Sequence, residues 1–362
     1  MSGLCNPPRR TRSKALCRRL HYFGFSLVEL MVASTVGLLI VGALVTVFVQ
    51  TGRSNNEMAK LNQQMENGRF ALQLLREDLW HAGFWGEYRP PDTVATALPP
   101  MCTAFSDWTP SDIANVLRVP VMGADDTVPT ECTTLISNRK AGTDVLLVRH
   151  ASTCVADTGA DNNCENFEAD KLYLQVSRCS ADAQELQMGT SPALFLLRKR
   201  DSSGKNCTAS GYTTTYADRR KVLSHLYYIR IDNTLMRSEL DYKYDSATAS
   251  GTVKQLGAQP LVGGIEHMEI EYGVDADGDG SADSLVSTPA DAAAWGNVVA
   301  VRVHLLARSL EATSGHDDSK VYQLGPTRLP ASPADGFHDG FARHVYSSFI
   351  RLQNPAGRRD NP

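Results

Sequence analysis

The sequence predicts an α+β fold, in which one long N-terminal helix packs on an antiparallel β-sheet domain. Two observations lead to this prediction. The run from Phe25 to Val49 is mainly apolar and carries a single charge, Glu29, and a helical period continues beyond it to about Trp80. From residue 144 onward the chain contains short runs rich in Val, Ile, Leu and Tyr, several of which alternate as half-buried strands do.

The apolar run is long enough to cross a membrane. As a helix, Phe25–Val49 would span about 37 Å at 1.5 Å per residue, against a hydrocarbon core of roughly 30 Å. Six basic residues and no acidic residue precede Glu29, which predicts that the N-terminus lies in the cytoplasm. A carboxylate inside such a run is costly unless a cation pairs with it, so we expect Glu29 to have a function.

Gly24, Phe25 and Glu29 stand in the run GFSLVELMVA, which closely resembles the signal of type IV prepilins and type II secretion pseudopilins. The resemblance implies that a prepilin peptidase cuts after Gly24 and methylates the new amine of Phe25. It also implies that Glu29 pairs with the amine of an adjacent subunit during assembly. The alternative is an ordinary signal anchor or a secretory signal, but this run exceeds a secretory one and lacks a small-residue cleavage site.

Four further blocks look like the PilW family of minor pilins. The resemblance implies a minor pilin that takes part in initiating or capping type IV pilus assembly. Its implied partners are other minor pilins and the major pilin, bound through the N-terminal helix. A type II secretion minor pseudopilin and a pilus-displayed adhesin or ligand-binding module stay open as alternatives. The blocks are residues 67–84 (NGRFALQLLREDLWHAGF), 264–273 (GIEHMEIEYG), 299–309 (VAVRVHLLARS) and 343–354 (RHVYSSFIRLQN).

These features together predict four segments and a location. Residues 1–24 are the leader, 25–50 the transmembrane half of the helix, 51–84 its amphipathic half, and 85–362 a disulfide-stapled, β-rich globular domain. We expect a single pass through the inner membrane with the globular domain in the periplasm, and exposure at the cell surface within a pilus. In the amphipathic half, a spacing of three and four residues predicts an apolar stripe that packs on the chain's own domain rather than in a coiled coil. The stripe is Met58, Leu61, Met65, Gly68, Leu72, Leu75 and Leu79.

Six of the eight cysteines follow the membrane segment, whereas Cys5 and Cys17 lie in the leader. An even number beyond a membrane anchor predicts an oxidising compartment and three disulfides. Six cysteines allow fifteen pairings, of which we favour the sequential one. Zinc binding is the competing interpretation, but the sequence has no CxxC pair and no HExxH motif. The favoured pairs are Cys102–Cys132, Cys154–Cys164 and Cys179–Cys207.

Residues 90–143 are rich in proline and predict an ordered, stapled insertion with few regular elements. Strands are predicted after it, with a hairpin turn at Asp232-Asn233. His267 and His304 fall inside strand patterns, where a structural role is expected. The predicted strands are Asp144–His150, Lys171–Arg178, Ala193–Arg198, Val222–Ile231, Thr234–Glu239, Ile265–Val274, Val298–Ala307 and Ala342–Leu352.

An Asp/Gly-rich run begins at Asp275 and matches the first part of an EF-hand calcium loop, with Gly280 at the sixth position. Val286 stands where the bidentate glutamate belongs, and no flanking helices are evident. The pattern therefore favours a solvated turn between strands, and the alternative is a loose calcium site. The ligands of such a site would be Asp275, Asp277, Asp279 and Asp283.

No motif in the sequence indicates catalysis. There is no GxSxG elbow, no metalloprotease pair and no glycine-rich phosphate loop after a strand. We therefore expect no enzyme activity, no catalytic residues and no cofactor apart from the calcium alternative. Without the leader, 36 − 6 = 30 basic residues stand against 40 acidic ones. This acidic balance argues against nucleic-acid binding.

Overall fold

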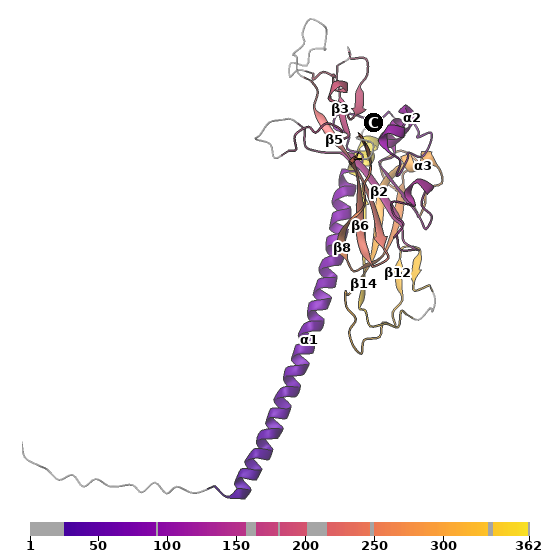
Figure 1. Ribbon diagram of the computed structural model, residues 1–362. Coiled ribbons are helices and arrows are strands. Elements are labelled where there is room, and N and C mark those ends of the chain that lie inside the picture. The colour runs from indigo at the N-terminus through magenta and orange to yellow at the C-terminus, as the bar shows by residue number, and fades with distance from the viewer. Residues whose placement is uncertain are drawn as a thin grey trace, which may run out of the picture. The chain divides into compact units, whose positions relative to one another are not determined.

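The computed structural model describes residues 25–91, 93–156, 164–179, 182–200, 216–246, 250–331 and 336–360. The chain divides into two compact units, Met1–Asn56 and Glu57–Pro362, and we call the second unit the head. Helix α1 (Leu27–His81) contributes its first part to one unit and its second part to the head. The head consists of this helical segment, β-sheets and short helices (Figure 1). The predicted α+β class is confirmed.

The larger sheet of the head has eight antiparallel strands. They run in the order β1-β2-β5-β3-β4, and β6 joins β5 to β7 and β8. Every residue of β2 is buried, which explains its continuous apolar run Val145–Val148. The strands are β1 (Val121–Ala124), β2 (Val145–Ala151), β3 (Tyr173–Val176), β4 (Leu186–Gly189), β5 (Arg219–Arg230), β6 (Thr234–Asp245), β7 (Ser250–Gln255) and β8 (Gln259–Gly263).

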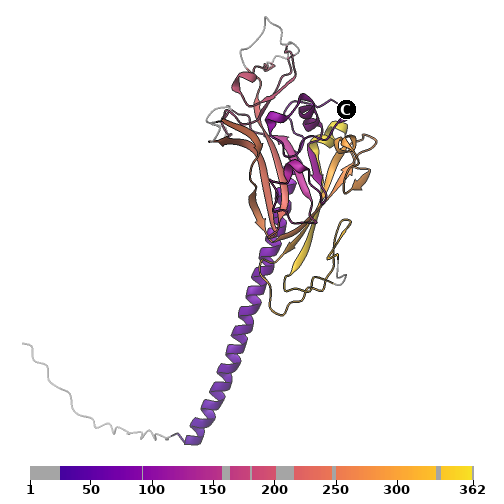
Figure 2. The ribbon, with the colours of Figure 1, turned by 45° about the vertical axis from the view of Figure 1, so that its right-hand side comes forward.

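A second sheet of four strands, in the order β10-β9-β11-β14, packs beside the first (Figure 2). The two sheets are joined at the start of β2, where the Asp144 amide donates to the Met268 carbonyl at 3.0 Å. The Asp144 carboxylate accepts the Ile270 amide at 2.7 Å. A small hairpin completes the β-structure. These strands are β9 (Ile265–Val274), β10 (Ser284–Val286), β11 (Val298–Arg308) and β14 (Arg343–Arg351), with β12 (Tyr322–Leu324) and β13 (Thr327–Leu329) in the hairpin.

The short helices lie between or after the strands. Helix α2 (Pro110–Arg118) starts with a capping box, in which the Thr109 hydroxyl accepts the Asp112 amide and the Asp112 carboxylate accepts the Thr109 amide. Pro110 occupies a first-turn position, where its missing N–H costs nothing. The remaining helices are α3 (Ala292–Gly296), α4 (Gln353–Asp360) and the 3₁₀ turns η1 (Phe105–Asp107), η2 (Thr130–Cys132) and η3 (Pro192–Leu194).

Three expectations about local structure need correction. The insertion 90–143, expected to be largely irregular, contains α2 and β1. No strand forms at 193–198, because Pro192 opens a 3₁₀ turn whose hydrogen bonds are local, and Leu196 is exposed. The hairpin turn between β5 and β6 has three residues rather than two, and Asn233 closes it with φ 63°.

The face of α1 that packs in the head differs from the expected stripe. Met58, Leu61 and Met65 are 59%, 44% and 46% exposed. The prediction that these three residues pack on the chain's own domain is therefore wrong. The buried face instead begins at Gln64, whose side-chain amide donates to the Ala307 carbonyl of β11 at 2.8 Å. Polar and small residues thus determine which side of the helix is buried. The buried residues are Gln64, Gly68, Ala71, Leu75, Asp78 and Leu79.

Gly68 marks the closest approach of α1 to the second sheet. A Cβ atom there would lie 2.2 Å from Cε2 of Tyr346 on β14, so no larger residue fits without displacing that ring. The Tyr346 hydroxyl is itself buried and has no hydrogen-bond partner in the described part of the chain. Close packing at this point is therefore maintained by shape rather than by a hydrogen bond.

We expect Gly68→Ala to lower the free energy of unfolding of the head by about 1–3 kcal/mol, because it overpacks this contact. Denaturant unfolding of the purified full chain in detergent would measure the loss. Gly52→Ala is the matched control, since nothing lies within 4 Å of that position and alanine favours a helix.

Tyr346→Ala removes the ring that the new methyl group meets. In that background the cost of Gly68→Ala should largely disappear. An equal cost with and without the ring would contradict the proposed contact.

Candidate functional site

The start of α1 contains the predicted assembly residue. The Ser26 amide donates to Oε2 of Glu29 at 3.0 Å, and the Ser26 hydroxyl accepts the Val28 amide at 3.3 Å. In the single chain, Glu29 thus caps its own helix, an arrangement that the S-x-x-E spacing could have predicted. Gly24 lies outside the described residues, so the cleavage point stays a prediction.

The apolar side chains of the first part of α1 are exposed. Its most apolar window of 18 residues has a mean hydropathy of 2.5 and is not buried. Phe25 and Phe48, near the two ends of the run, are 88% and 80% exposed. This helix is long and apolar enough to cross a membrane, which fits membrane anchoring.

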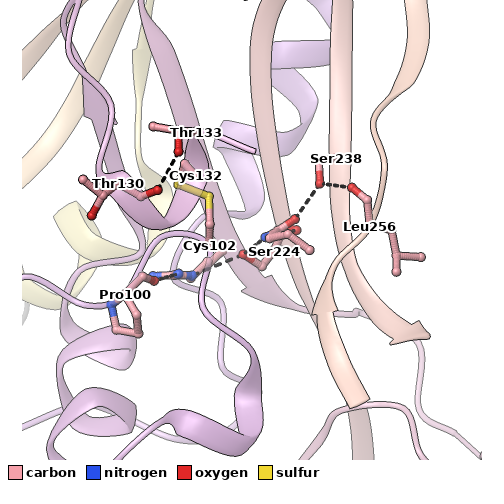
Figure 3. The surroundings of a disulfide bond; sticks show 10 residues. Pro100, Cys102, Thr130, Cys132, Thr133, Ser224, Ser238 and Leu256 are labelled. Atoms are coloured by element: carbon pink, nitrogen blue, oxygen red, sulfur yellow. Dashed lines mark hydrogen bonds between the residues drawn. A yellow bond between two sulfur atoms is a disulfide. The ribbon is translucent and has the colours of Figure 1, made fainter. Parts of the chain in front are cut away.

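Two of the three predicted disulfides are confirmed. Cys102 pairs with Cys132 and Cys154 pairs with Cys164, with Cα–Cα distances of 5.2 and 5.4 Å. The first bridge closes the insertion that contains α2 beside the larger sheet (Figure 3). Cys207 of the third pair lies outside the described residues, so that pairing stays a prediction.

Arg149 of β2 connects the stapled insertion to the sheet. Its guanidinium donates to the Pro100 carbonyl, two residues before Cys102, and its Nε donates to the Ser224 hydroxyl at 3.2 Å. It also lies 5.5 Å from the centre of the Trp108 ring. Burial lowers the pKa of Arg149 to about 9.

From Ser224 the hydrogen bonds continue into the sheet. The Gln255 side chain donates to the Ser224 hydroxyl at 3.1 Å, and the Ser238 hydroxyl contacts the Gln255 side chain at 3.0 Å and the Leu256 carbonyl at 2.6 Å (Figure 3). The insertion is therefore held by a covalent bridge and by a buried polar network.

The acidic loop brings Asp275, Asp277 and Asp283 together, with one carboxylate oxygen from each within 4.8 Å of the others. Asp275 is fully buried, and its oxygens accept the Gly278 amide at 2.6 Å and the Gly280 amide at 2.9 Å. Asp279 accepts the Ser281 amide instead. The loop thus forms a set of side-chain turns.

Arg359 of α4 supplies the positive charge in this loop. Its guanidinium contacts Oδ2 of Asp275 at 2.9 Å and the Asp275 carbonyl at 3.2 Å. Burial alone would raise the pKa of the Asp275 carboxyl, but Arg359 and the two glycine amides hold it below its ordinary value. The oxygen that would bind calcium thus already faces a cation, and the calcium site stays an untested alternative to the favoured solvated turn.

A cluster that the sequence did not suggest lies where α1 ends. Asp78 of α1 meets His150 of β2 and His225 of β5, at 3.0 and 2.9 Å from Oδ1. Burial would raise the pKa of the Asp78 carboxyl, but the hydrogen bonds from the two histidines hold it well below its usual range. The three residues come from distant segments, so no local spacing in the sequence could have revealed them.

The aromatic residues near the end of α1 divide between the core and the surface. Trp85 is 1% exposed and donates from its indole nitrogen to the Leu117 carbonyl at 2.9 Å. Phe84 and Tyr88 pack around the same core. Trp80, in contrast, is 48% exposed and lies outside this core. His304 has the expected structural role, with hydrogen-bond contacts to Ser347 and Glu271.

Part of the chain is similar to a known protein family. Residues 226–354 match the family model of type IV pilus-assembly protein W, PilW. This region is PilW-like. It contains three of the four sequence blocks that resemble PilW, so the predicted resemblance is confirmed. The PilW-like region runs from β5 through β14 and includes the whole second sheet.

Among solved structures, a type IV-like pilin from Thermus thermophilus is similar to this chain. The TM-score is 0.33 and the sequence identity is 11%, over 81% of this chain and 97% of that one. No curated protein matches the chain significantly. The PilW-like region supports a type IV pilus-related pilin.

The Arg359–Asp275 pair predicts how the acidic loop responds to calcium. Millimolar Ca²⁺ should leave the melting temperature of the wild-type chain unchanged, because Arg359 already neutralises the buried carboxylate. Arg359→Gln should lower stability by about 2–4 kcal/mol by leaving that charge unpaired. Added Ca²⁺ should then restore part of the loss.

Thermal unfolding with and without Ca²⁺ would measure these effects. Arg302→Gln, which breaks a more exposed contact with Glu271, is the control and should gain no calcium response. Calcium-dependent heat from the wild-type chain in a calorimeter would instead support the EF-hand-like interpretation.

Proposed function

We propose that this chain is a minor pilin that takes part in initiating or capping type IV pilus assembly. The observation that carries the proposal is the PilW-like region in a head that follows an exposed apolar helix. Prepilin peptidase would cleave after Gly24 and methylate Phe25. The mature chain would be stored in the inner membrane, with the domain of residues 85–362 in the periplasm. Its role would be assembly rather than catalysis.

The mechanism follows from the surface of the first part of α1. Its apolar side chains need either hydrocarbon or other apolar helices around them. Leaving the bilayer is therefore favourable only when such helices pack together, and other minor pilins and the major pilin supply them. Glu29 needs a cation there, and no side chain of the run Phe25–Val49 supplies one. The proposed partner is the N-terminal amine of an adjacent subunit.

The size of the head supports a place at the tip. Cleavage would leave 338 residues (362 − 24), most of them outside α1. In a helical filament each subunit has only a wedge of space between its neighbours. A head of this size repeated along the shaft would collide with the subunits above and below it. At the tip nothing stacks above it, so the same bulk is accommodated.

Gly24→Leu should block maturation, because a side chain at the scissile bond would hinder the peptidase. The full-length chain should then accumulate in the membrane with its basic leader attached. Immunoblotting of membranes together with mass spectrometry of the N-terminus would measure this. Gly37→Ala, within the apolar run, is the control and should mature normally. A mature-sized product of Gly24→Leu would overturn the cleavage point.

Deletion of the gene should reduce the number of pili per cell much more than their diameter. The wild-type chain should restore the number, whereas Glu29→Gln should be cleaved and inserted but restore it poorly. Glu57→Gln, an exposed helical position, is the control and should complement fully. Electron microscopy and quantification of sheared pili would measure the outcome.

The same strains separate the alternatives. A type II secretion pseudopilin would instead alter secretion while pilus number stays normal, and an adhesin would alter binding without altering pilus number. Labelled protein spread evenly along sheared filaments, in amounts rivalling the main subunit, would contradict a place at the tip.

A further inference from the structure

We propose that Asp78, His150 and His225 bind one divalent transition-metal ion of the zinc class inside the head. The inference is independent of the role in pilus assembly. One carboxylate oxygen and one imidazole nitrogen from each histidine lie within 4.8 Å of one another. Two imidazoles and a carboxylate form a typical donor set for Zn²⁺.

The positions of the ligands follow from the sheet register. His225 pairs with Val148, and His150 pairs with Leu223, on the adjacent strands β5 and β2. The two histidines are therefore diagonal neighbours on one face of the sheet. Asp78 approaches that face from α1, whose last turn packs there. All three ligands stand on regular elements, which fixes them better than loops would.

The outer atoms of two ligands are held by hydrogen bonds, as in known metal sites. Oδ2 of Asp78 accepts the Tyr227 hydroxyl at 3.1 Å, which leaves Oδ1 directed toward the histidines. Nδ1 of His150 lies 2.9 Å from the Ala151 carbonyl, so it must carry a proton. Nε2 of His150 faces Oδ1 of Asp78. It either carries a second proton, so that the ring is cationic, or has a free lone pair that can bind a metal ion.

The distances suit a small cation. Zn²⁺ binds nitrogen and oxygen ligands at about 2.0–2.1 Å, so the ligand atoms of one site lie roughly 3–3.5 Å apart. The nitrogens of His150 and His225 are 3.0 and 2.9 Å from Oδ1 of Asp78. These two separations need to open by only a few tenths of an ångström to match a zinc site. A metal ion displaces the proton on each nitrogen that faces Asp78, and water completes the coordination.

Burial indicates a structural rather than a catalytic site. The side chains of Asp78, His150 and His225 are 9%, 8% and 9% exposed, so few water molecules compete for the ion. A bound ion would tie the end of α1 to β2 and β5. The metal would thus stabilise the packing of the end of α1 in the head.

The test uses the mature full chain in detergent, purified without a histidine tag or a chelator and then stripped of metal. Added Co²⁺ should give visible d–d absorption typical of four-coordinate nitrogen and oxygen ligation, at one ion per chain. Zn²⁺ should remove this absorption by competition, and should raise the melting temperature of the stripped chain. Metal analysis of the unstripped protein should find a bound ion of this class.

Variants locate the site. His150→Gln and His225→Gln should weaken Co²⁺ binding on the order of 100-fold or more, and Tyr227→Phe should weaken it about 10-fold while keeping the spectrum. His304→Gln is the matched control. That histidine is 9% exposed, stands on a strand and contacts a carboxylate, but within the described part of the chain it belongs to no group of three potential metal ligands. It should bind Co²⁺ as the wild type does.

Two results would overturn the proposal. One is a stripped wild-type chain that is folded, as judged by circular dichroism, and gives no Co²⁺ absorption. This result would leave the cluster as an ion pair between Asp78 and a protonated His150. The other is wild-type affinity in both histidine variants, which would place the metal elsewhere in the chain.

Discussion

The packing of residues 64–79 of α1 against the sheets is the constraint on which the head depends. Ala71, Leu75 and Leu79 are completely buried in the main core, which also includes residues from both sheets. Without this helical segment, apolar side chains of both sheets would face water, and their burial is the main stabilising contribution in a domain of this kind. This helical segment is therefore an integral part of the hydrophobic core of the head.

Three contacts fix the position and rotation of this helical segment against the sheets. Gln64 donates to the Ala307 carbonyl on the second sheet, Gly68 admits the Tyr346 ring, and Asp78 meets histidines on the first sheet. The apolar residues between them supply most of the stabilisation, but apolar contacts are not directional. The polar and close contacts specify the register of the helix along the sheets. A buried polar group lost from its partner costs more than the hydrogen bond itself contributes, so sliding or rotating the helix is penalised at both ends.

Much of this fold follows from local patterns in the sequence. The helix bounds, β9 and β11 were predicted closely, because their apolar periods are long and uninterrupted. Two disulfides were predicted from their number and order along the chain. Helix α2 was missed although its capping box, Thr109 to Asp112, is readable in the sequence. The prolines around it had suggested an irregular insertion.

The errors have a common physical cause. Which face of α1 is buried depends on what the partner surface offers, and apolarity alone cannot specify it. Met58 and Met65 are apolar and exposed, whereas Gln64 is polar and buried because β11 presents it with a carbonyl group. The Asp78 cluster is the extreme case, since its members lie about 70 and 150 residues apart. Only the pairing of β2 with β5 and the position of α1 bring them together.

Buried carboxylates in this head differ in what neutralises them, and the difference bears on metal binding. Asp275 faces Arg359, and Asp318 faces Arg343 at 2.9 Å. A guanidinium stays charged at any physiological pH and does not bind metal ions, so a cation would have to displace it. Asp78 faces imidazoles instead, which can lose a proton and then offer a lone pair. The buried carboxylate of the acidic loop therefore faces a partner that does not bind metal ions, whereas the carboxylate at the end of α1 faces partners that can. The choice of arginine or histidine as partner, rather than the number of carboxylates, indicates where the head can bind a metal ion.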